Sequence, residues 1–301
     1  MHKIWFIFLL DLSAYMMKNL ESLFRNMREI ELSGSELKLI ERIWGKETAF
    51  NVSVYSFYYD SDGREVKGFL AYPKKIQERL PVIIWNRGGS DKTGLIDNFL
   101  AKGLLAEIAS WGYIVLASQY RKDDEFGGND VNDILNLIEL SDKLELADSS
   151  RIGMEGWSRG GMMSYIVLTK TDRIKCCVIV AGLADLIRNE KAKNKLDKVL
   201  IEKIGGGNEE EFLKKKKERS AVNFYSKISK ATNVLFIHGT SDEKILQEDS
   251  VDMYVKLSSA NPGTEYELKL IQGGDHYLRK NRKEVSVIRK SWFDKYLKFN
   301  C

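Results

Sequence analysis

Strand-like and helix-like segments alternate from residue 82 to the end of the chain, and this alternation constrains the fold more than any other feature. Short runs rich in apolar and β-branched residues predict strands at 82–85, 114–118, 151–156, 176–180, 234–238 and 265–271. Helical spacing predicts helices at 96–110, 131–141, 160–169, 250–260 and 283–299. Strands separated by helices are typical of an α/β fold, with a mostly parallel central sheet and helices on both faces.

The N-terminal part follows a different pattern. Residues 18–44 predict two short helices, the first from apolar residues at helical spacing and the second from the capping box that Ser33 and Glu36 form. Residues 51–59 and 65–72, separated by Ser61-Asp62-Gly63, predict an antiparallel hairpin. We therefore expect an N-terminal helical extension over residues 1–45 and one α/β domain over residues 46–301.

Residues 182–232 interrupt the alternation, because they contain two charged helical patterns (183–200 and 209–219) and no strand pattern. They lie between two predicted strands, on the side where ligands bind in open α/β sheets. This position favours a helical lid that shapes a pocket. A peripheral decoration is the alternative.

The segment Gly156-Trp157-Ser158-Arg159-Gly160 carries the main chemical signal. It follows a predicted strand and opens a predicted helix, as a G-x-S-x-G nucleophile elbow requires. The two glycines allow the strand and the helix to approach each other around a strained serine. Ser158 is therefore the candidate nucleophile, and a glycine-rich turn with an idle serine is the alternative.

A serine hydroxyl needs an adjacent base, and the chain has three histidines. His276 lies in a loop between the last strand and the last helix, where it can reach the elbow. His238 ends a strand and is predicted to be structural, and it is the alternative base.

Asp242 follows the 234–238 strand and is the candidate acid that orients His276. Glu243 is the nearest competitor. Asp275 adjoins His276, but neighbouring side chains diverge. The order Ser158, Asp242, His276 is the order expected of α/β-hydrolases.

An oxyanion also needs hydrogen-bond donors. The backbone N–H of Arg159, at the start of a helix, is the expected first donor. The loop Asn86-Arg87-Gly88-Gly89 is expected to supply a second, and a plain turn is the alternative.

The composition excludes several classes of protein. The 47 basic and 43 acidic residues give a net charge of +4 without a basic cluster interleaved with aromatic residues, so we expect no nucleic-acid partner. Three cysteines, two of them adjacent in an apolar run, predict a reducing compartment, the cytoplasm. The apolar run from Ile4 to Leu10 is too short to span a bilayer. A signal peptide or membrane-surface contact through this run is the alternative.

At these residues the chain resembles the catalytic domain of the prolyl oligopeptidase family, within the α/β-hydrolase superfamily. The resemblance covers about residues 65–300 and rests on four motifs: residues 86–89, residues 119–121 with 127–130, residues 148–162, and residues 218–220 leading into 235–243 (LFIHGTSDE). It implies a mechanism in which Ser158, Asp242 and His276 cleave peptide or ester bonds in small substrates without a cofactor or a metal ion.

Two departures from the family weaken the peptidase interpretation. About 45 residues precede the predicted hairpin, so we expect no β-propeller there. Arg87 stands where several family peptidases carry an oxyanion tyrosine, so the second donor is a backbone N–H of Arg87 or Gly88, or the Arg87 guanidinium. A pair of glutamates for a peptide amino terminus is also not evident. We therefore predict a serine hydrolase for small esters or short peptides, with an esterase favoured over a prolyl oligopeptidase-like peptidase. A non-catalytic ligand-binding pseudo-hydrolase is the further alternative.

Overall fold

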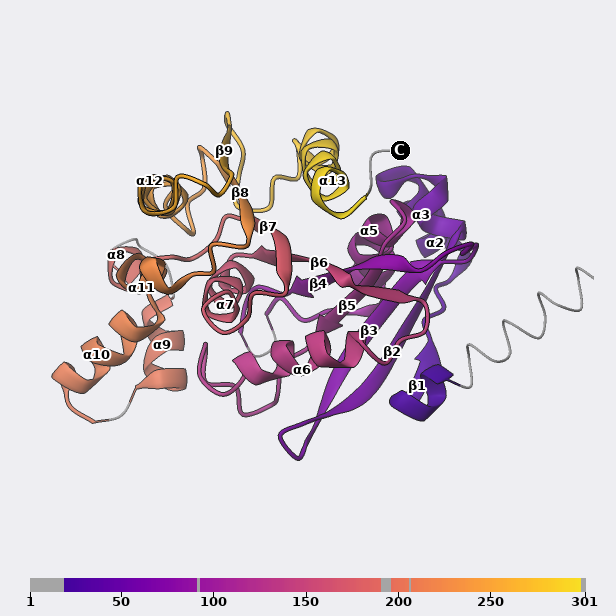
Figure 1. Cartoon of the computed structure of the whole chain (residues 1–301), viewed down its shortest axis with the longest axis horizontal. Helices are drawn as coiled ribbons and strands as arrows, with labels where there is room; N and C mark the ends of the chain where they lie inside the picture. The colour runs from indigo at the N-terminus through magenta and orange to yellow at the C-terminus, as the bar shows by residue number, and fades with distance from the viewer. Residues whose placement is uncertain (1–18, 91–92, 191–195, 206, 299–301) are drawn as a thin grey trace, which may run out of the picture.

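The computed structural model describes residues 19–298 except 91–92, 191–195 and 206, and nine of its strands form one mixed sheet (Figure 1). The strand order is β1-β2-β3-β5-β4-β6-β7-β8-β9. In chain order the strands are β1 (Arg25–Glu29), β2 (Val52–Ser61), β3 (Arg64–Pro73), β4 (Leu80–Asn86), β5 (Ile114–Ser118), β6 (Ala147–Trp157), β7 (Ile174–Val180), β8 (Asn233–Gly239) and β9 (Tyr266–Ile271).

The strands from β5 to β9 are parallel to one another, as the alternating pattern predicts. The central strands β4 and β7 are buried on both faces, which explains why their sequences are almost continuously apolar. Because the strands are parallel, the carboxyl ends of β4, β6, β8 and β9 lie at the same edge of the sheet. All the candidate site residues follow one of these ends.

Helices cover both faces of the sheet, and each face has its own apolar core (Figure 1). On one face pack α6 (Val131–Ser141), α7 (Arg159–Val167) and α12 (Glu248–Ala260). On the other pack α5 (Ala106–Ser110) and α13 (Arg282–Leu297). The predicted α/β fold with helices on both faces is confirmed.

The predicted first helix is wrong beyond Leu23. Residues 19–23 are helical, but Arg25–Glu29 form strand β1, which pairs antiparallel with β2. The apolar spacing that predicted the helix has another origin, since Phe24 stacks on Phe57 of β2 at 3.9 Å between ring centroids. Tertiary pairing with the predicted hairpin, which forms as β2 and β3, overrides the local helical pattern. The second helix, α2 (Gly34–Trp44), begins at the predicted capping box.

The predicted helix at 96–110 forms over residues 98–110 and contains a π-helical stretch. It divides into α4 (Asn98–Leu100), a π-helical stretch at Ala101–Leu105 and α5. A Cβ atom on Gly103 would lie 2.7 Å from the Trp44 ring. Glycine at this position therefore makes room for Trp44 of α2 to pack against the π-helical stretch.

Residues 182–232 contain helices and no strand in their described part. The helices are α8 (Leu186–Glu190), α9 (Leu196–Ile204), α10 (Glu209–Arg219) and α11 (Ala221–Phe224), followed by a 3-10 turn at Tyr225–Lys227. Figure 1 places α9 and α10 together at one end of the molecule, beyond α7.

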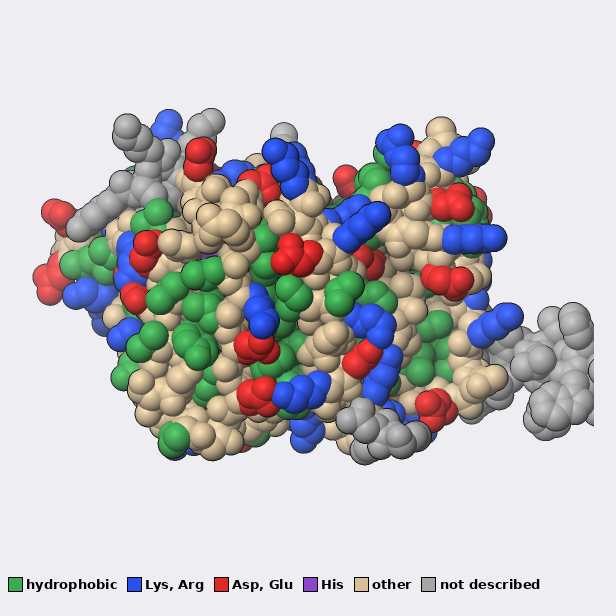
Figure 2. Space-filling view, turned by 90° about the horizontal axis from the view of Figure 1, so that it is seen from above, with side chains coloured by type: hydrophobic (Ala, Val, Ile, Leu, Met, Phe, Trp, Pro, Cys, Tyr) green, Lys and Arg blue, Asp and Glu red, His purple; other side chains and the backbone are tan. Residues whose placement is uncertain are grey.

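On the face shown in Figure 2, basic and acidic side chains are interspersed, with apolar side chains between them. Within the described residues, no helix is long and apolar enough to cross a membrane. The described residues also contain no cluster of three or more His, Cys, Asp or Glu that could hold a metal ion. The apolar run from Ile4 to Leu10 lies outside the described residues.

Candidate active site

Ser158 occupies a sharp turn between β6 and α7. Its backbone angles, φ 57° and ψ −119°, are strained for a residue with a side chain. Two hydrogen bonds hold the turn, from Ser158 N to the Val180 carbonyl at 3.0 Å and from Leu183 N to the Ser158 carbonyl at 3.1 Å. A Cβ atom on Gly160 would lie 2.0 Å from the Asn86 carbonyl oxygen, so this position requires glycine.

His276 and Asp242 form a hydrogen-bonded pair on the loops that follow β9 and β8. Nδ1 of His276 lies 2.7 Å from Oδ2 of Asp242, and the side chains are 10% and 0% exposed. A carboxylate only accepts hydrogen bonds, so Nδ1 carries the proton and the Nε2 lone pair stays available. The other carboxylate oxygen of Asp242 accepts the backbone N–H groups of Lys244 and Ile245, at 2.8 and 3.0 Å.

The Asp242 carboxylate is strongly favoured in its charged form. Burial acts to raise its pKa, but hydrogen bonds from His238, His276 and the Ile245 backbone outweigh burial and hold the pKa well below its usual range. A permanently charged carboxylate suits the orientation and stabilisation of a histidine base.

His238 is a buried partner of Asp242. Its Nε2 lies 3.3 Å from Oδ2 of Asp242 and 3.0 Å from the Ile245 carbonyl oxygen, and its Nδ1 lies 2.7 Å from Oγ of Ser250. The carbonyl can only accept, so Nε2 is the protonated nitrogen. Both ring nitrogens thus have protein partners, as expected of a structural histidine. The sequence did not predict the contact with Asp242, although the short spacing within His238-Gly-Thr-Ser-Asp242 is a usable signal.

Ser158 and His276 line one cavity of about 1450 Å³. Part of its wall is apolar and comes from the N-terminal helix α2 (Trp44) and from β4 (Trp85). Leu196 and Val199 of α9 also line it, so the helical insertion contributes to the cavity. Glu243 lines the cavity, whereas Asp275 accepts the backbone N–H of Arg279 at 3.2 Å.

The segment after β4 packs directly on the elbow. A Cβ atom on Gly88 would lie 2.9 Å from the Trp157 carbonyl oxygen and 3.2 Å from Cβ of Ser158. The first N–H groups of a helix have no partner within the helix, so the Arg159 N–H, next to Ser158, has no acceptor within α7. Whether this N–H and the Gly88 segment bind an oxyanion stays a prediction.

The Arg87 guanidinium is turned into its own loop. It is 2% exposed, and it donates to the carbonyl oxygens of Gln119 at 2.9 Å and Gly88 at 3.0 Å. It also lies over the Tyr120 ring at 4.8 Å. Arg87 is not among the described residues that line the cavity, so the geometry disfavours its guanidinium as an oxyanion donor.

The side chain of Arg159 is buried and joins the elbow to the loops that contain Gly89, Asp124 and Asp130. It is 2% exposed, and its Nη2 lies 2.8 Å from Asp124 and 2.7 Å from Asp130, while Nη1 donates to the Gly89 carbonyl at 3.1 Å. Burial acts to lower the pKa of Arg159, but the two carboxylates outweigh it and raise the pKa. From the sequence alone, only the backbone N–H of Arg159 was expected to have a role. The acidic residues of the 119–130 segment were the available signal for its side chain.

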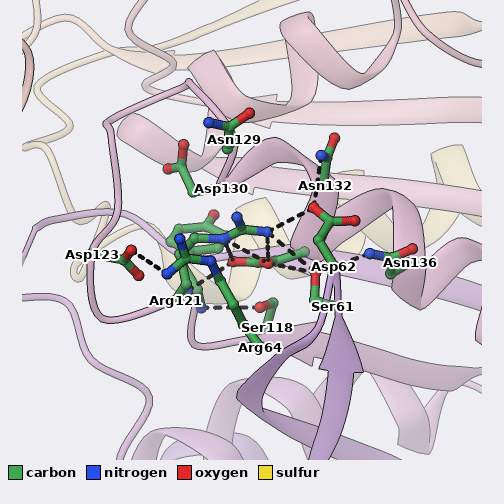
Figure 3. A network of polar contacts seen from close by, with 12 residues as sticks. Ser61, Asp62, Arg64, Ser118, Arg121, Asp123, Asn129, Asp130, Asn132 and Asn136 are labelled. Atoms are coloured by element: carbon green, nitrogen blue, oxygen red, sulfur yellow. Dashed lines mark hydrogen bonds and ion pairs between the residues drawn. The ribbon is translucent and has the colours of Figure 1, made fainter.

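A second polar network holds the same segment to the hairpin (Figure 3). Arg121 lies 2.7 Å from Asp133 of α6 and 3.2 Å from Asp62 at the hairpin turn. Ser61 donates to Asp133 at 2.6 Å. The loop that carries the partners of Arg159 is therefore fixed at both ends, by the hairpin and by α6.

A buried ion cluster underlies the cavity beside Trp157. Glu155 of β6 receives two bonds from Arg289, at 2.9 and 2.8 Å, and Arg289 also donates to Glu107 at 3.1 Å. The indole N–H groups of Trp157 and Trp85 donate to the same Glu155 oxygen at 2.7 and 3.0 Å. The cluster fixes Trp157, the residue that precedes Ser158. No local pattern predicts the cluster, because its members come from distant elements.

The fold, with a serine at a strand–helix turn and a histidine–aspartate pair at the same sheet edge, is that of an α/β-hydrolase, and the protein is a serine hydrolase. The chain belongs to the prolyl oligopeptidase family, whose family model matches residues 108–300.

Among curated proteins, the uncharacterized peptidase YtmA of Bacillus subtilis (strain 168) is 25% identical over 222 residues, which are 71% of this chain and 83% of that protein. Dipeptidyl aminopeptidase B of Saccharomyces cerevisiae is 25% identical over 169 residues, 56% of this chain and 19% of that protein. Among solved structures, the acylaminoacyl peptidase of Pyrococcus horikoshii superposes with a TM-score of 0.70 at 24% identity, over 82% of this chain and 42% of that one. The chain thus spans most of YtmA but less than half of the other two.

Proposed function

We propose that the protein is a serine peptidase that cleaves short peptides or acylated amino acids through an acyl-enzyme on Ser158. The observation that carries this proposal is the His276–Asp242 pair, whose histidine lines the same cavity as the strained Ser158. The sequence interpretation favoured an esterase. The relatives support its alternative instead, because they are named as peptidases and the comparisons give the esterase preference no support.

In this proposal, Nε2 of His276 takes the Ser158 hydroxyl proton as Oγ attacks the substrate carbonyl carbon. The backbone N–H of Arg159 and one from the Gly88 segment stabilise the oxyanion. His276 then gives the proton to the leaving amine as the acyl–nitrogen bond breaks. Water, activated by the same histidine, hydrolyses the acyl-enzyme and restores Ser158.

The cavity supports a substrate larger than a simple acyl ester. It extends from Ser158 to the insertion helix α9 and to Trp44 of α2, and its volume of about 1450 Å³ is at or above the range typical of small-molecule sites. We propose that α9 acts as one wall of the peptide-binding region. The helical insertion over residues 182–232 would then shape the substrate pocket and would not be a peripheral addition to the fold.

Labelling with a fluorophosphonate probe tests the nucleophile. We expect the wild type and Ser150→Ala to be labelled, and Ser158→Ala to remain unlabelled. Ser150 is a suitable control because it is exposed on the same strand, β6, toward the opposite edge of the sheet. Labelling of Ser158→Ala at the wild-type rate would rule out Ser158.

A substrate panel tests the peptidase assignment. Each acyl group is offered both as an amide of an amino acid and as the matching simple ester. Since esters are intrinsically easier to cleave, the informative result is amide turnover. Amide cleavage that is lost in Ser158→Ala supports a peptidase, whereas cleavage of esters alone would restore the esterase interpretation.

A further inference from the structure

The segment that follows His276 brings two arginines to the cavity. Arg279 lies in the loop just after His276, and Arg282 is the first residue of α13. Both line the same cavity as Ser158 and His276.

These two arginines differ from the buried arginines at the site in their charge compensation. Arg159 has Asp124 and Asp130 as counterions, and Arg289 has Glu155 and Glu107. In the described part of the chain, no carboxylate lies within 4.0 Å of the guanidinium nitrogens of Arg279 or Arg282. This holds although Glu202 and Glu243 line the same cavity.

The Arg282 guanidinium is held in place by groups that do not neutralise it. It lies over the Trp44 ring at 4.6 Å from the ring centroid, and it donates one hydrogen bond to the Ile43 carbonyl oxygen. Burial lowers its pKa, and the more distant Glu107 only partly opposes this. A guanidinium stacked on an aromatic face keeps its in-plane donors directed sideways, where they match a carboxylate.

Arg279 is positioned in a similar way. Its guanidinium lies over the Tyr277 ring at 4.6 Å, and its backbone N–H is fixed by Asp275. Within the described residues, two oriented cations without a carboxylate partner therefore line the cavity, the exposed Arg279 near His276 and the half-buried Arg282 at Trp44. An anionic part of the substrate would supply a counterion for both.

We propose that Arg279 and Arg282 bind a free carboxylate on the leaving group. The enzyme then prefers peptides or acylated amino acids whose C-terminus lies close to the scissile bond. This inference rests on the proposed peptidase function. We place the carboxylate on the leaving group because His276 delivers its proton to the leaving amine. Arg279 and Arg282 follow His276 in the chain and line the same cavity, so they face that part of the substrate.

The test compares an N-blocked dipeptide that has a free C-terminal carboxylate with its C-terminal amide. We expect wild-type kcat/KM to be about ten- to hundredfold higher for the acid, the range of a charge-assisted hydrogen bond. Arg282→Gln and Arg279→Gln should each reduce the acid-to-amide ratio at least several-fold. Because both substrates are measured on the same protein, partial misfolding cancels from the ratio.

Two further variants sharpen the result. Lys283→Gln removes a neighbouring exposed charge that is not among the described residues of the cavity wall, and it should keep the wild-type ratio. Arg282→Lys retains the charge but loses the planar fork, so its ratio should fall between those of the wild type and Arg282→Gln.

A wild-type ratio near one, or a ratio unaffected by both glutamine substitutions, overturns the carboxylate site and leaves the proposed peptidase intact. Absence of both turnover and fluorophosphonate labelling overturns the peptidase, and the inference with it. If Ser158 is labelled but neither dipeptide is cleaved, the test is how well each dipeptide blocks labelling of Ser158 by the fluorophosphonate probe. We then expect the acid to block labelling at a concentration at least tenfold lower than the amide. Equal blocking by the acid and the amide overturns the carboxylate site.

Discussion

Nδ1 of His276 lies 2.7 Å from Oδ2 of Asp242, although the two residues are 34 positions apart in the sequence. The pair forms because Asp242 follows β8, His276 follows β9, and these strands are parallel neighbours. A rigid sheet therefore holds two loop side chains at hydrogen-bond distance, as pre-organised catalysis requires.

Asp242→Asn tests this pair. The amide keeps the shape of the side chain but can favour the wrong histidine tautomer, so we expect kcat to fall by roughly 10³- to 10⁴-fold. Steady-state kinetics on a chromogenic substrate measures the loss. Asp275→Asn, which alters the carboxylate next to His276, is the control and should cost far less. Equal losses in the two variants would contradict the assignment of Asp242.

His238→Asn tests the second histidine on Asp242. The substitution removes a buried donor to the Ile245 carbonyl and to Asp242, which should cost about 1–3 kcal/mol of stability. We expect activity to fall by about ten- to hundredfold, because Asp242 loses one of the groups that fix it. Urea unfolding and kcat should both be measured. The base would be misassigned if His276→Asn stayed active while His238→Asn was inactive.

Gly88→Ala tests how closely the Gly88 segment, which follows β4, approaches Ser158. The added methyl would lie 2.9 Å from the Trp157 carbonyl oxygen, so the segment must shift and kcat should drop by about tenfold or more. Gly34→Ala is the control, since no atom lies within 4 Å of its added methyl. Wild-type kcat in Gly88→Ala would exclude a role for this segment in oxyanion binding.

Arg159→Met tests the buried ion pair below the elbow. The variant leaves the Asp124 and Asp130 carboxylates buried without their partner, so the free energy of unfolding should fall by about 3–5 kcal/mol. Arg173→Met is the control. It breaks exposed pairs with Glu139 and Asp142, which should change stability by less than about 1 kcal/mol. Chemical denaturation compares the two, and similar losses would contradict the role of burial.

Asp249→Asn tests a pH dependence of stability. Asp249 accepts the backbone N–H groups of Ala184 and Asp185 at 2.7 and 3.0 Å, and burial raises its pKa to about 6. The usual value for an unfolded aspartate is about 3.9. Between these values the folded state binds more protons than the unfolded state, so this carboxyl lowers the free energy of unfolding as the pH rises.

The asparagine can still accept both backbone bonds, but it carries no charge. Relative to the wild type, Asp249→Asn should therefore gain stability as the pH rises from about 4 to 6, and the difference should stay constant above that window. Urea unfolding of both proteins from pH 4 to 7.5 gives the difference directly. A difference that does not change with pH would contradict the raised pKa.

Much of the fold follows from local sequence. The ranges predicted for β5 and α6 coincide with the observed elements, because a continuously apolar segment and a strongly periodic one are each specified by local sequence. The failure at Arg25–Glu29 has the opposite cause. A short segment pairs with β2 there, and the pairing partner lies outside any local window.

The sequence by itself also determined the candidate serine, histidine and aspartate, because each stands at a predicted strand end and parallel strands bring those ends to one edge. Only the tertiary structure decided what surrounds them. The ion pairs of Arg159, the cluster of Arg289 with Glu155 and Glu107, and the stacking of Arg282 on Trp44 join elements that are distant in the chain. Such contacts depend on packing geometry and charge balance in three dimensions, which no local pattern of residue types encodes.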